Sequence, residues 1–406
     1  MEQYTGILGI IVLLSISFLL SNNRSLVDKN IIFWGLGLQF SFAFIILKTS
    51  FGEKLFFYFN IFIVKLISFA DAGSDFLFTS FIPEVGYDQA LLNFAFRALP
   101  VIIFFSSLIA VTYHLGIIQF VIKNISLLME KTMKTSGAET LSISANIFVG
   151  QTEAPILIRP YISLMTKSEL MAVMVGGFAT VAGSVMALYV TWLNNIPDIA
   201  GHLLAASVMS APAALMVAKI IYPETNSLKT INSNKINLKS NDNNIVDAVG
   251  RGATEGLKLA ANVAAMLIAF ISMVAMINFV LGLLGTSMQE ILGLLFKPLA
   301  WTMGIPWKDA EIVGTLMGEK IVLTELIAFR DLSDYVTKNI LSERSIIITS
   351  YALCGFANFG SIGIQLGGIG SMAPERKKDL SRIVFKAMLG GAIASWLTAS
   401  IVGIII

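Results

Sequence analysis

Residues 140–160 read TLSISANIFVGQTEAPILIRP, an apolar stretch that the polar sequence Gln-Thr-Glu interrupts. Residues 310–329, AEIVGTLMGEKIVLTELIAF, have the same character. At about 1.5 Å per helical residue, arms of about 11 residues reach only half-way through a hydrocarbon core of about 30 Å. We therefore predict two re-entrant helical hairpins, near residues 136–165 and 307–332. Such backbone exists at membrane depth only where protein or a cavity surrounds it.

The composition of the whole chain is that of a membrane protein. Of its 406 residues 56% are hydrophobic and 13% are charged, whereas soluble proteins carry about 25% charged residues. The formal net charge of +2 is too small for a basic surface that would hold nucleic acid. One cysteine and two histidines argue against a disulfide and against a Cys-rich or multi-His metal centre.

Eight uncharged stretches are long enough to span a bilayer as helices. They are Gln3–Asn23, Asn30–Leu47, Ala98–Ile122, Leu170–Pro197, Ile199–Ala218, Leu259–Gln289, Ser345–Pro374 and Ala387–Ile406. The first lacks a basic start and a cleavage site, so we expect a retained span and no signal peptide. Lys and Arg follow the first, third, fifth and seventh spans, which predicts that both termini lie outside, in the periplasm of a bacterial inner membrane. Residues 51–69 are predicted to form an amphipathic interfacial helix.

A polar stretch divides the chain into two similar halves. We predict an N-terminal part (1–90), a first repeat (91–223), a cytoplasmic linker (224–250) and a second repeat (251–406). Each repeat has a span, an amphipathic stretch, a hairpin and two further spans. Local sequences recur in the same order: Ala-Glu (138, 310), Thr-Glu (152, 324), Ser-Glu (168, 342) and Phe-Ala-polar (178, 356). The predicted directions of corresponding spans are opposite, and inverted repeats with broken helices are typical of secondary transporters.

The interruption in the first hairpin carries groups suited to a polar ring. Gly150 and Pro155 flank Gln151, Thr152 and Glu153, which predicts a hairpin tip with free backbone groups. Gln151 offers a donor and an acceptor, Thr152 a hydroxyl and Glu153 an acceptor. This set can bind the edge of a polar heterocycle.

The second hairpin has Glu325, beside Thr324, at the matching place. A buried carboxylate binds vicinal hydroxyls well, because each O–H gains a charge-assisted acceptor. Charged groups inside a membrane protein indicate function by default. The alternative is that Glu153 and Glu325 only pair with the nearby bases Arg159 and Lys320.

The seventh span combines polar groups with glycine. Asn358 and Ser361 are three residues apart, so both lie on one helix face. The glycines at 355, 360 and 363, like those between 176 and 183 in the fourth span, favour a break in the helix. Close packing of small residues is the alternative explanation for the glycines, and the run 367–370 is assigned to packing alone.

A coupling cation needs hard oxygen ligands, such as hydroxyls, amide oxygens and carbonyls freed by unwinding. Asn146, Thr180 and Ser184 lie near the first hairpin tip and the first predicted break. The carbonyls of Val149 and Val181 are close in sequence. A threonine in a membrane helix also commonly bonds its own i−4 carbonyl.

At these motifs the chain resembles the concentrative nucleoside transporter family, in its eight-span bacterial form. The resemblance rests on Gly150–Pro155, on Gly318-Glu319-Lys320 with Thr324-Glu325, and on Cys354–Asn358 with Ser361. It implies a homotrimer whose contacts use the third and sixth spans. It also implies a transport domain that moves as an elevator.

The resemblance further implies roles for individual residues. Gln151, Thr152 and Glu153 contact the nucleobase, with Val185 packed against it. The ribose is held by Glu325, Asn358 and Ser361, and Phe356 lines the site. A sodium site is formed by Asn146, Val149, Thr180, Val181 and Ser184.

We therefore predict an all-α integral membrane protein that imports nucleosides such as uridine with sodium, without an organic cofactor or a nucleic-acid partner. Coupling to protons and transport of another polar solute, such as a nucleobase or a dicarboxylate, remain alternatives. An intramembrane enzyme with Glu153 and Glu325 as acid and base is disfavoured, because no catalytic motif accompanies them.

Overall fold

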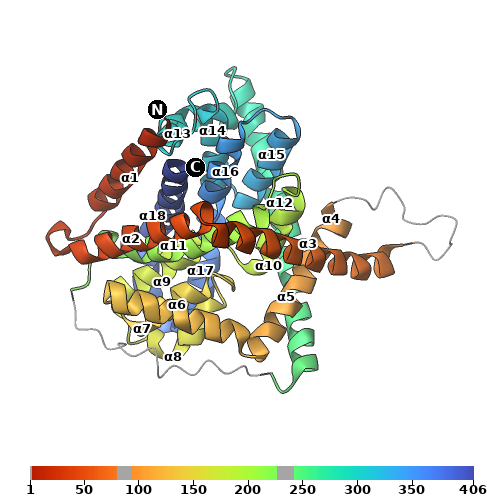
Figure 1. The fold of residues 1–406 in the computed structure, drawn as a ribbon, viewed down its shortest axis with the longest axis horizontal. Helices are drawn as coiled ribbons and strands as arrows, with labels where there is room; N and C mark the ends of the chain where they lie inside the picture. The colour runs from red at the N-terminus through yellow and green to blue at the C-terminus, as the bar shows by residue number, and fades with distance from the viewer. Residues whose placement is uncertain (1, 80–93, 226–241) are drawn as a thin grey trace.

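The computed structural model describes residues 2–79, 94–225 and 242–406, and every regular element in them is a helix (Figure 1). The predicted all-α fold class is thus confirmed. The helices are α1 (Glu2–Leu19), α2 (Lys29–Lys48), α3 (Ser50–Phe78), α4 (Phe94–Arg97), α5 (Leu99–His114), α6 (Ile117–Met133), α7 (Gly137–Ala145), α8 (Arg159–Ile162), α9 (Lys167–Ala179), α10 (Gly183–Trp192), α11 (Ile199–Ile221), α12 (Ile245–Gly282), α13 (Met288–Thr302), α14 (Ala310–Val322), α15 (Glu325–Thr337), α16 (Glu343–Leu353), α17 (Phe359–Met372) and α18 (Lys377–Ile405). Short 3₁₀ helices are η1 (Arg24–Leu26), η3 (Ala154–Ile158) and η5 (Pro374–Arg376).

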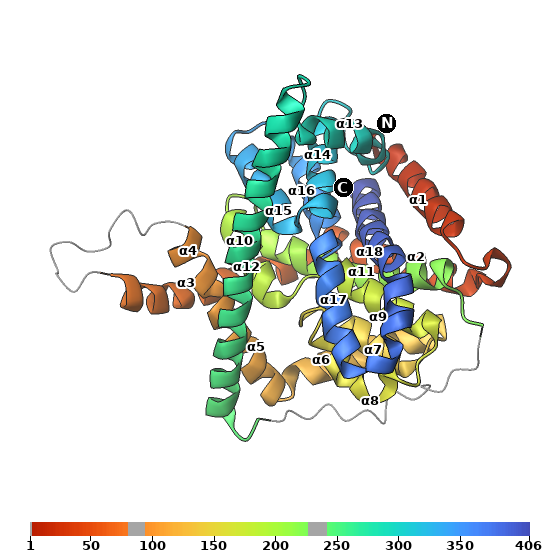
Figure 2. The same cartoon turned by 180° about the vertical axis from the view of Figure 1, so that it is seen from behind.

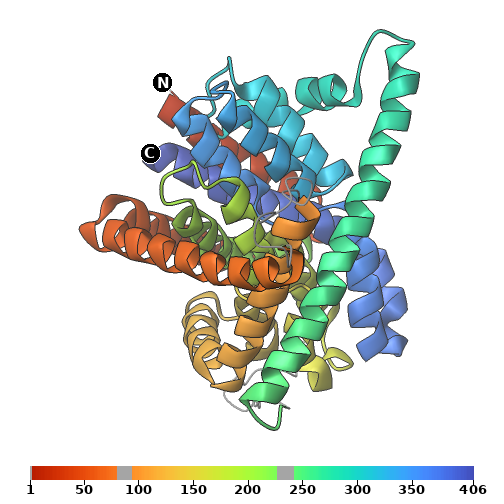
Figure 3. The same cartoon turned by 90° about the vertical axis from the view of Figure 1, so that its right-hand side faces the viewer.

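Seven helical segments in the described residues are long and apolar enough to cross a membrane. They include α3, for which the sequence predicted an interfacial position, and they omit the shorter α1 and the broken α16–α17 pair. In Figures 1 to 3, α3 runs crosswise to the long α12. The count of eight spans and the interfacial position of α3 stay predictions.

Two predicted spans are wrong in their limits. The span Ala98–Ile122 ends early, because Gly116 adopts φ +81° between α5 and α6. The residues after Gly116 form α6, which is the predicted amphipathic helix. The span Leu259–Gln289 begins too late, since α12 already starts at Ile245, inside the predicted linker, and ends at Gly282. Its first turns are charged but exposed, and Arg251 pairs there with Asp242 at 2.6 Å.

The two hairpin sequences fold differently. In the first, α7 is regular but the returning arm consists of η3 and the single turn α8. Pro155 and Pro160 each stand at the start of one of these short pieces, and proline cannot continue a hydrogen-bonded helix. In the second, α14 and α15 are both regular and α15 extends to Thr337, beyond the predicted limit at 332.

The order of elements from α5 to α11 recurs from α12 to α18: a long helix, a helix beside it, a hairpin, a broken helix and a long helix. The first members, α5 and α12, are antiparallel neighbours (Figure 3). A Cβ on Gly252 would lie 2.6 Å from the Cα of Ser107, and one on Gly256 would lie 2.7 Å from the Cα of Ile103. The inverted arrangement of the repeats in a membrane stays a prediction.

Small residues allow this close approach. Ala248, Gly252, Gly256 and Ala260 are all buried and recur every fourth residue of α12, which places them on one helix face. Small residues at this spacing let two helix backbones come together. This stripe was not predicted from the sequence.

Replacing Gly256 with Leu is expected to destabilise the protein by forcing α5 and α12 apart. Overpacking of this kind costs about 1–3 kcal/mol or more, and the obstacle here includes backbone. The Tm of the detergent-purified protein is expected to fall. Gly250→Leu is the matched control, since no atom of the residues that the structure describes would lie within 4 Å of a Cβ on Gly250. Equal Tm values for the two variants would show that the stripe does not set the helix contact.

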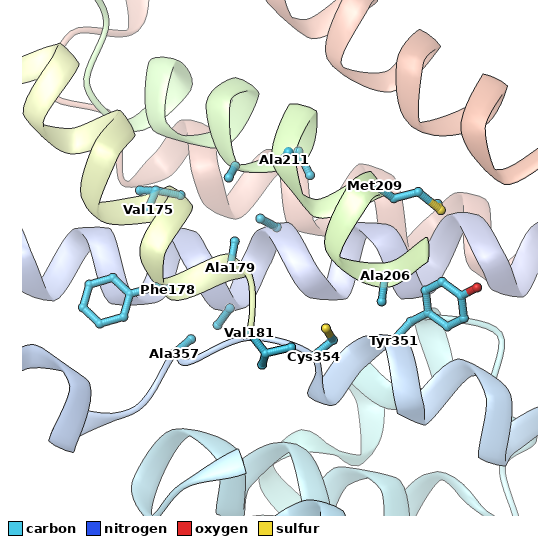
Figure 4. Packing of buried hydrophobic residues seen from close by; sticks show 14 of the residues in the cluster. Val175, Phe178, Ala179, Val181, Ala206, Met209, Ala211, Tyr351, Cys354 and Ala357 are labelled. Atoms are coloured by element: carbon cyan, nitrogen blue, oxygen red, sulfur yellow. The ribbon is translucent and has the colours of Figure 1, made fainter. Parts of the chain in front are cut away.

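The broken helices lie in the interior of the molecule. Nearly all residues of α9, α11 and the later part of α18 are buried. Figure 2 shows α17 beside the start of α18, and Figure 4 shows the two breaks packed among these helices. The centre of the fold is therefore non-helical backbone surrounded by protein, as membrane depth requires.

Candidate functional site

The two helix breaks contact each other. The first separates α9 from α10 at residues 180–182, and the second separates α16 from α17 at residues 354–358. The amide of Phe356 donates a hydrogen bond to the carbonyl of Thr180 at 3.3 Å. Gly355 has φ +129°, and a Cβ there would lie 2.7 Å from the carbonyl oxygen of Phe178. Only glycine therefore allows the breaks to cross, and Figure 4 shows Ala179 and Val181 near Cys354 and Ala357.

A chain of hydrogen bonds runs from the first hairpin to the second. Gln151 Nε2 donates to Ser361 Oγ at 3.2 Å, although 210 residues separate them. The amide of Ser361 donates to Asn358 Oδ1 at 2.8 Å, and Asn358 Nδ2 donates to Glu325 Oε2 at 2.7 Å. All four residues are buried. The structure thus brings together one predicted base-contacting residue and all three predicted ribose-contacting residues.

Tyr189, which was not predicted from the sequence, joins this chain of hydrogen bonds. Its hydroxyl donates to Glu325 Oε1 at 3.2 Å. Its ring stacks on Phe329 with centroids 4.1 Å apart, so the hydroxyl is held in place. Tyr189 is four residues after Val185 in α10, and this spacing on a helix face could have identified it.

Gln365 is the second residue that was missed. Its Nε2 donates to Gln151 Oε1 at 3.1 Å and to the carbonyl of Met174 at 3.1 Å. It is 1% exposed. Asn358, Ser361 and Gln365 are spaced i, i+3, i+7, which places them on one face of α17.

The other predicted substrate contacts surround this chain. Val185 is buried in the first turn of α10 and Phe356 is half-buried. Thr152 packs on α17, because a Cβ on Gly368 would lie 2.8 Å from its Cγ2. Glu153 is exposed and its carboxylate lies over Gly150. Within the part of the chain that the structure describes, no hydrogen bond joins Glu153 to this chain of hydrogen bonds, so its role rests on its place at the hairpin tip.

Neither of the two alternative ion pairs is formed as a direct contact among the described residues. None of the ion pairs found there joins Glu153 to Arg159 or Glu325 to Lys320. Lys320 is fully buried and donates instead to the carbonyl of Ala352 at 2.9 Å and to Ser395 Oγ at 2.7 Å. Its ammonium thus binds the end of α16, where carbonyls lack helical partners.

The predicted cation ligands lie where the first hairpin tip contacts the first break. The amide of Gly183 donates to the carbonyl of Phe148 at 3.0 Å, which links the two segments. Asn146 is 1% exposed, and its Oδ1 has no hydrogen-bond partner among the described residues. An orphaned buried amide oxygen is suited to a cation, because an acceptor without a partner is costly in the interior.

The remaining predicted ligands are also enclosed. Thr180 and Ser184 are buried, and Val181 is fully buried, while Val149 is half-buried. The Thr180 hydroxyl donates to the carbonyl of Gly176 at 3.0 Å, the i−4 bond common in membrane helices. Its oxygen keeps lone pairs for a second partner.

Models of known protein families match most of the chain. Three family models match the chain: the Na⁺-dependent nucleoside transporter N-terminus over residues 8–81, a nucleoside recognition "Gate" model over 95–195, and the Na⁺-dependent nucleoside transporter C-terminus over 202–403. The uncharacterized transporter YutK of Bacillus subtilis is 41% identical over 414 residues, with both chains fully covered. This chain belongs to the Na⁺-dependent nucleoside transporter family.

Other members of the family are similar over the whole chain. Sodium/nucleoside cotransporter 1 of Rattus norvegicus is 41% identical over 428 residues. The chain spans 64% of the length of that protein. The human protein of the same name is 40% identical over 427 residues, and the chain again spans 64% of its length.

Solved structures of the family share the fold. CNTnw in an inward-facing substrate-bound state matches with a TM-score of 0.91 and 40% identity, covering 98% of each chain. A CNTnw variant in an outward-facing state matches with a TM-score of 0.90 and 38% identity, covering 100% of this chain and 98% of that chain. Structures of one transporter in opposite states are what alternating access requires.

Proposed function

We propose that the protein is a sodium-coupled nucleoside symporter and not an enzyme. The observation that carries the proposal is the buried hydrogen-bonded chain from Gln151 through Ser361 and Asn358 to Glu325. It places amide, hydroxyl and carboxylate groups from two hairpin regions and one broken helix at a single interior site. Such a set suits a ligand with a polar ring at one end and vicinal hydroxyls at the other.

The roles proposed for the residues are those that the resemblance to the nucleoside transporter family implies. Gln151, Thr152 and Glu153, with Val185, bind the nucleobase; Glu325, Asn358 and Ser361, with Phe356, bind the ribose. The ribose hydroxyls donate to the Glu325 carboxylate, because ionised carboxylates are acceptors only. Tyr189 donates a hydrogen bond to Oε1 of that carboxylate, and Asn358 donates one to Oε2.

Nucleoside uptake into proteoliposomes tests the function as a whole. Radiolabelled uridine is expected to accumulate unchanged under an inward sodium gradient and not under a proton gradient alone. Uptake driven equally by protons would contradict sodium coupling. Tight binding of uracil in calorimetry would contradict the ribose site, since a free base has no hydroxyls for Glu325.

The coupling ion is proposed to bind Asn146, Ser184, Thr180 and the carbonyls of Val149 and Val181. The orphaned Oδ1 of Asn146 supports this. Sodium there fastens the first hairpin tip to the first break and so organises the base-binding residues. By thermodynamic linkage, bound nucleoside raises the affinity for sodium, and bound sodium raises the affinity for nucleoside by the same factor.

Replacing Asn146 with Leu is expected to raise the half-saturating sodium concentration for uridine binding at least about tenfold, as loss of one good ligand implies. The measurement is uridine binding over a sodium titration. Asn124→Leu is the matched control: like Asn146, Asn124 donates to its i−4 carbonyl, but it is exposed. Unchanged sodium dependence in the Asn146 variant would refute the assigned ion site.

The wider organisation is proposed as follows. The protein is a homotrimer in the bacterial inner membrane, and both of its termini are periplasmic. An N-terminal part precedes two inverted repeats (91–223 and 251–406), and a linker separates the two repeats. Trimer contacts use α5 and α12; many large apolar side chains on α12, among them Ile268, Met276 and Phe279, are exposed in the single chain. The transport domain moves as an elevator that carries both ligands past this scaffold.

A further inference from the structure

Gln365 fixes which way the amide of Gln151 points. The carbonyl of Met174 is an acceptor only, so the Gln365 atom 3.1 Å from it must be Nε2. The same nitrogen lies 3.1 Å from the Gln151 side chain, so the Gln151 atom facing it must be the acceptor Oε1. Nε2 of Gln151 therefore points the other way, toward Ser361 Oγ. A backbone carbonyl in α9 thus determines the orientation of both amides.

The surroundings leave the pair little freedom. Gln365 is 1% exposed and Gln151 is 7% exposed. A Cβ on Gly177 would lie 2.6 Å from Gln365 Nε2 and 3.1 Å from Gln151 Cβ. The absence of a side chain at residue 177 therefore provides the space in which the two amides meet.

We propose that Gln365 is a positioning residue that determines base specificity. It makes Gln151 present an N–H donor to the nucleobase. The site then favours a base with a carbonyl group at the ring position that Gln151 contacts over a base with an amino group there. The proposal rests on the proposed function, in particular on the base contact of Gln151. One hydrogen of Gln151 Nε2 is directed to Ser361, and the second remains for the ligand. Uridine carries a carbonyl where cytidine carries an amino group, so the two nucleosides report the orientation.

Gln365→Glu reverses the orientation without a large change in shape. At this buried position the protonated carboxyl donates its O–H to the carbonyl of Met174, and the same oxygen then accepts from Gln151. Gln151 must turn its Nε2 toward residue 365 and its Oε1 toward the ligand. The ratio of uridine to cytidine affinity is expected to shift about tenfold toward cytidine, the effect of exchanging about one hydrogen bond.

Equilibrium binding of both nucleosides to the full-length protein in detergent, with saturating sodium, measures this ratio. Gly177→Ala is a second route to the same effect, since it displaces the Gln365 amide and leaves Gln365 itself unaltered. It is expected to move the ratio in the same direction. Gln39→Glu is the control: Gln39 is also buried and donates to a backbone carbonyl at 2.9 Å, but it lies in α2. The ratio of uridine to cytidine affinity in the Gln39→Glu variant is expected to equal that of the unaltered protein.

A double-variant cycle separates orientation from general disturbance. In a Gln151→Ala background, Gln365→Glu is expected to leave the ratio unchanged, because no amide remains to be turned. The inference is overturned if the ratio of uridine to cytidine affinity is unchanged in both the Gln365→Glu and the Gly177→Ala variants. It is also overturned if Gln365→Glu shifts this ratio equally with and without Gln151→Ala. If the unaltered protein bound neither nucleoside, the proposed function itself would be wrong and this inference with it.

Discussion

Replacing Glu325 with Gln is expected to weaken uridine binding by about a hundredfold or more. Hydrogen bonds to a charged acceptor contribute about 1.5–3 kcal/mol each, and the ribose offers two vicinal hydroxyls. The variant also cannot accept from both Asn358 and Tyr189, which now hold the two carboxylate oxygens at 2.7 and 3.2 Å. The substituted side chain therefore loses its charge and one of its two acceptor oxygens.

Isothermal titration with uridine and with its dideoxy analogue, which lacks the two ribose hydroxyls, checks this. The unaltered protein is expected to discriminate strongly between them, and the variant only weakly. Glu311→Gln is the matched control, because Glu311 lies on the same hairpin but pairs with Lys297 at 2.7 Å outside the site. Normal uridine binding by the Glu325 variant would show that the ribose role is wrongly assigned.

Replacing Lys320 with Met is expected to give the second large effect, a loss of stability and of uridine affinity together. Its Nζ binds the carbonyl of Ala352 and Ser395 Oγ, and it approaches the carbonyl of Cys354 at 3.5 Å. Methionine fills the space but leaves these buried acceptors without a donor, at about 1–3 kcal/mol for each group. Because Cys354 begins the break that carries Phe356 and Asn358, the binding groups are expected to lose their positions.

The measurements are Tm and uridine affinity in the purified protein. Lys297→Met serves as the control, since Lys297 is less buried and forms a peripheral ion pair with Glu311. Exposed or partly exposed ion pairs contribute about 0–1 kcal/mol. A Tm and an affinity that match this control would mean that Lys320 does not hold the end of α16.

Both predictions depend on features that the sequence indicates only in part. The sequence located the helix breaks well, because their causes are local. Gly355 with its positive φ ends α16, and the prolines of the first hairpin turn its returning arm into short pieces. Counting uncharged residues placed the ends of two spans wrongly, since a helix such as α12 continues through charged residues that remain exposed.

The contacts between residues at the site could not be predicted from the sequence in the same way. Tyr189 and Glu325 are 136 residues apart, and Gln151 and Gln365 are 214 residues apart. Their contacts exist only because two broken helices and two hairpins pack at one point. Nor did the sequence distinguish whether Lys320 pairs with Glu325 or, as found, with the end of α16.

The sequence by itself determined the membrane class, the helical fold, the breaks and most of the polar groups at the site, because hydropathy and backbone preferences act over a few residues. Tertiary structure alone decided which of these groups meet, which way the Gln151 amide points, and how closely α5 and α12 approach. These properties follow from packing between segments far apart in the chain, and a hydrogen bond or a close helix contact has no counterpart in local sequence.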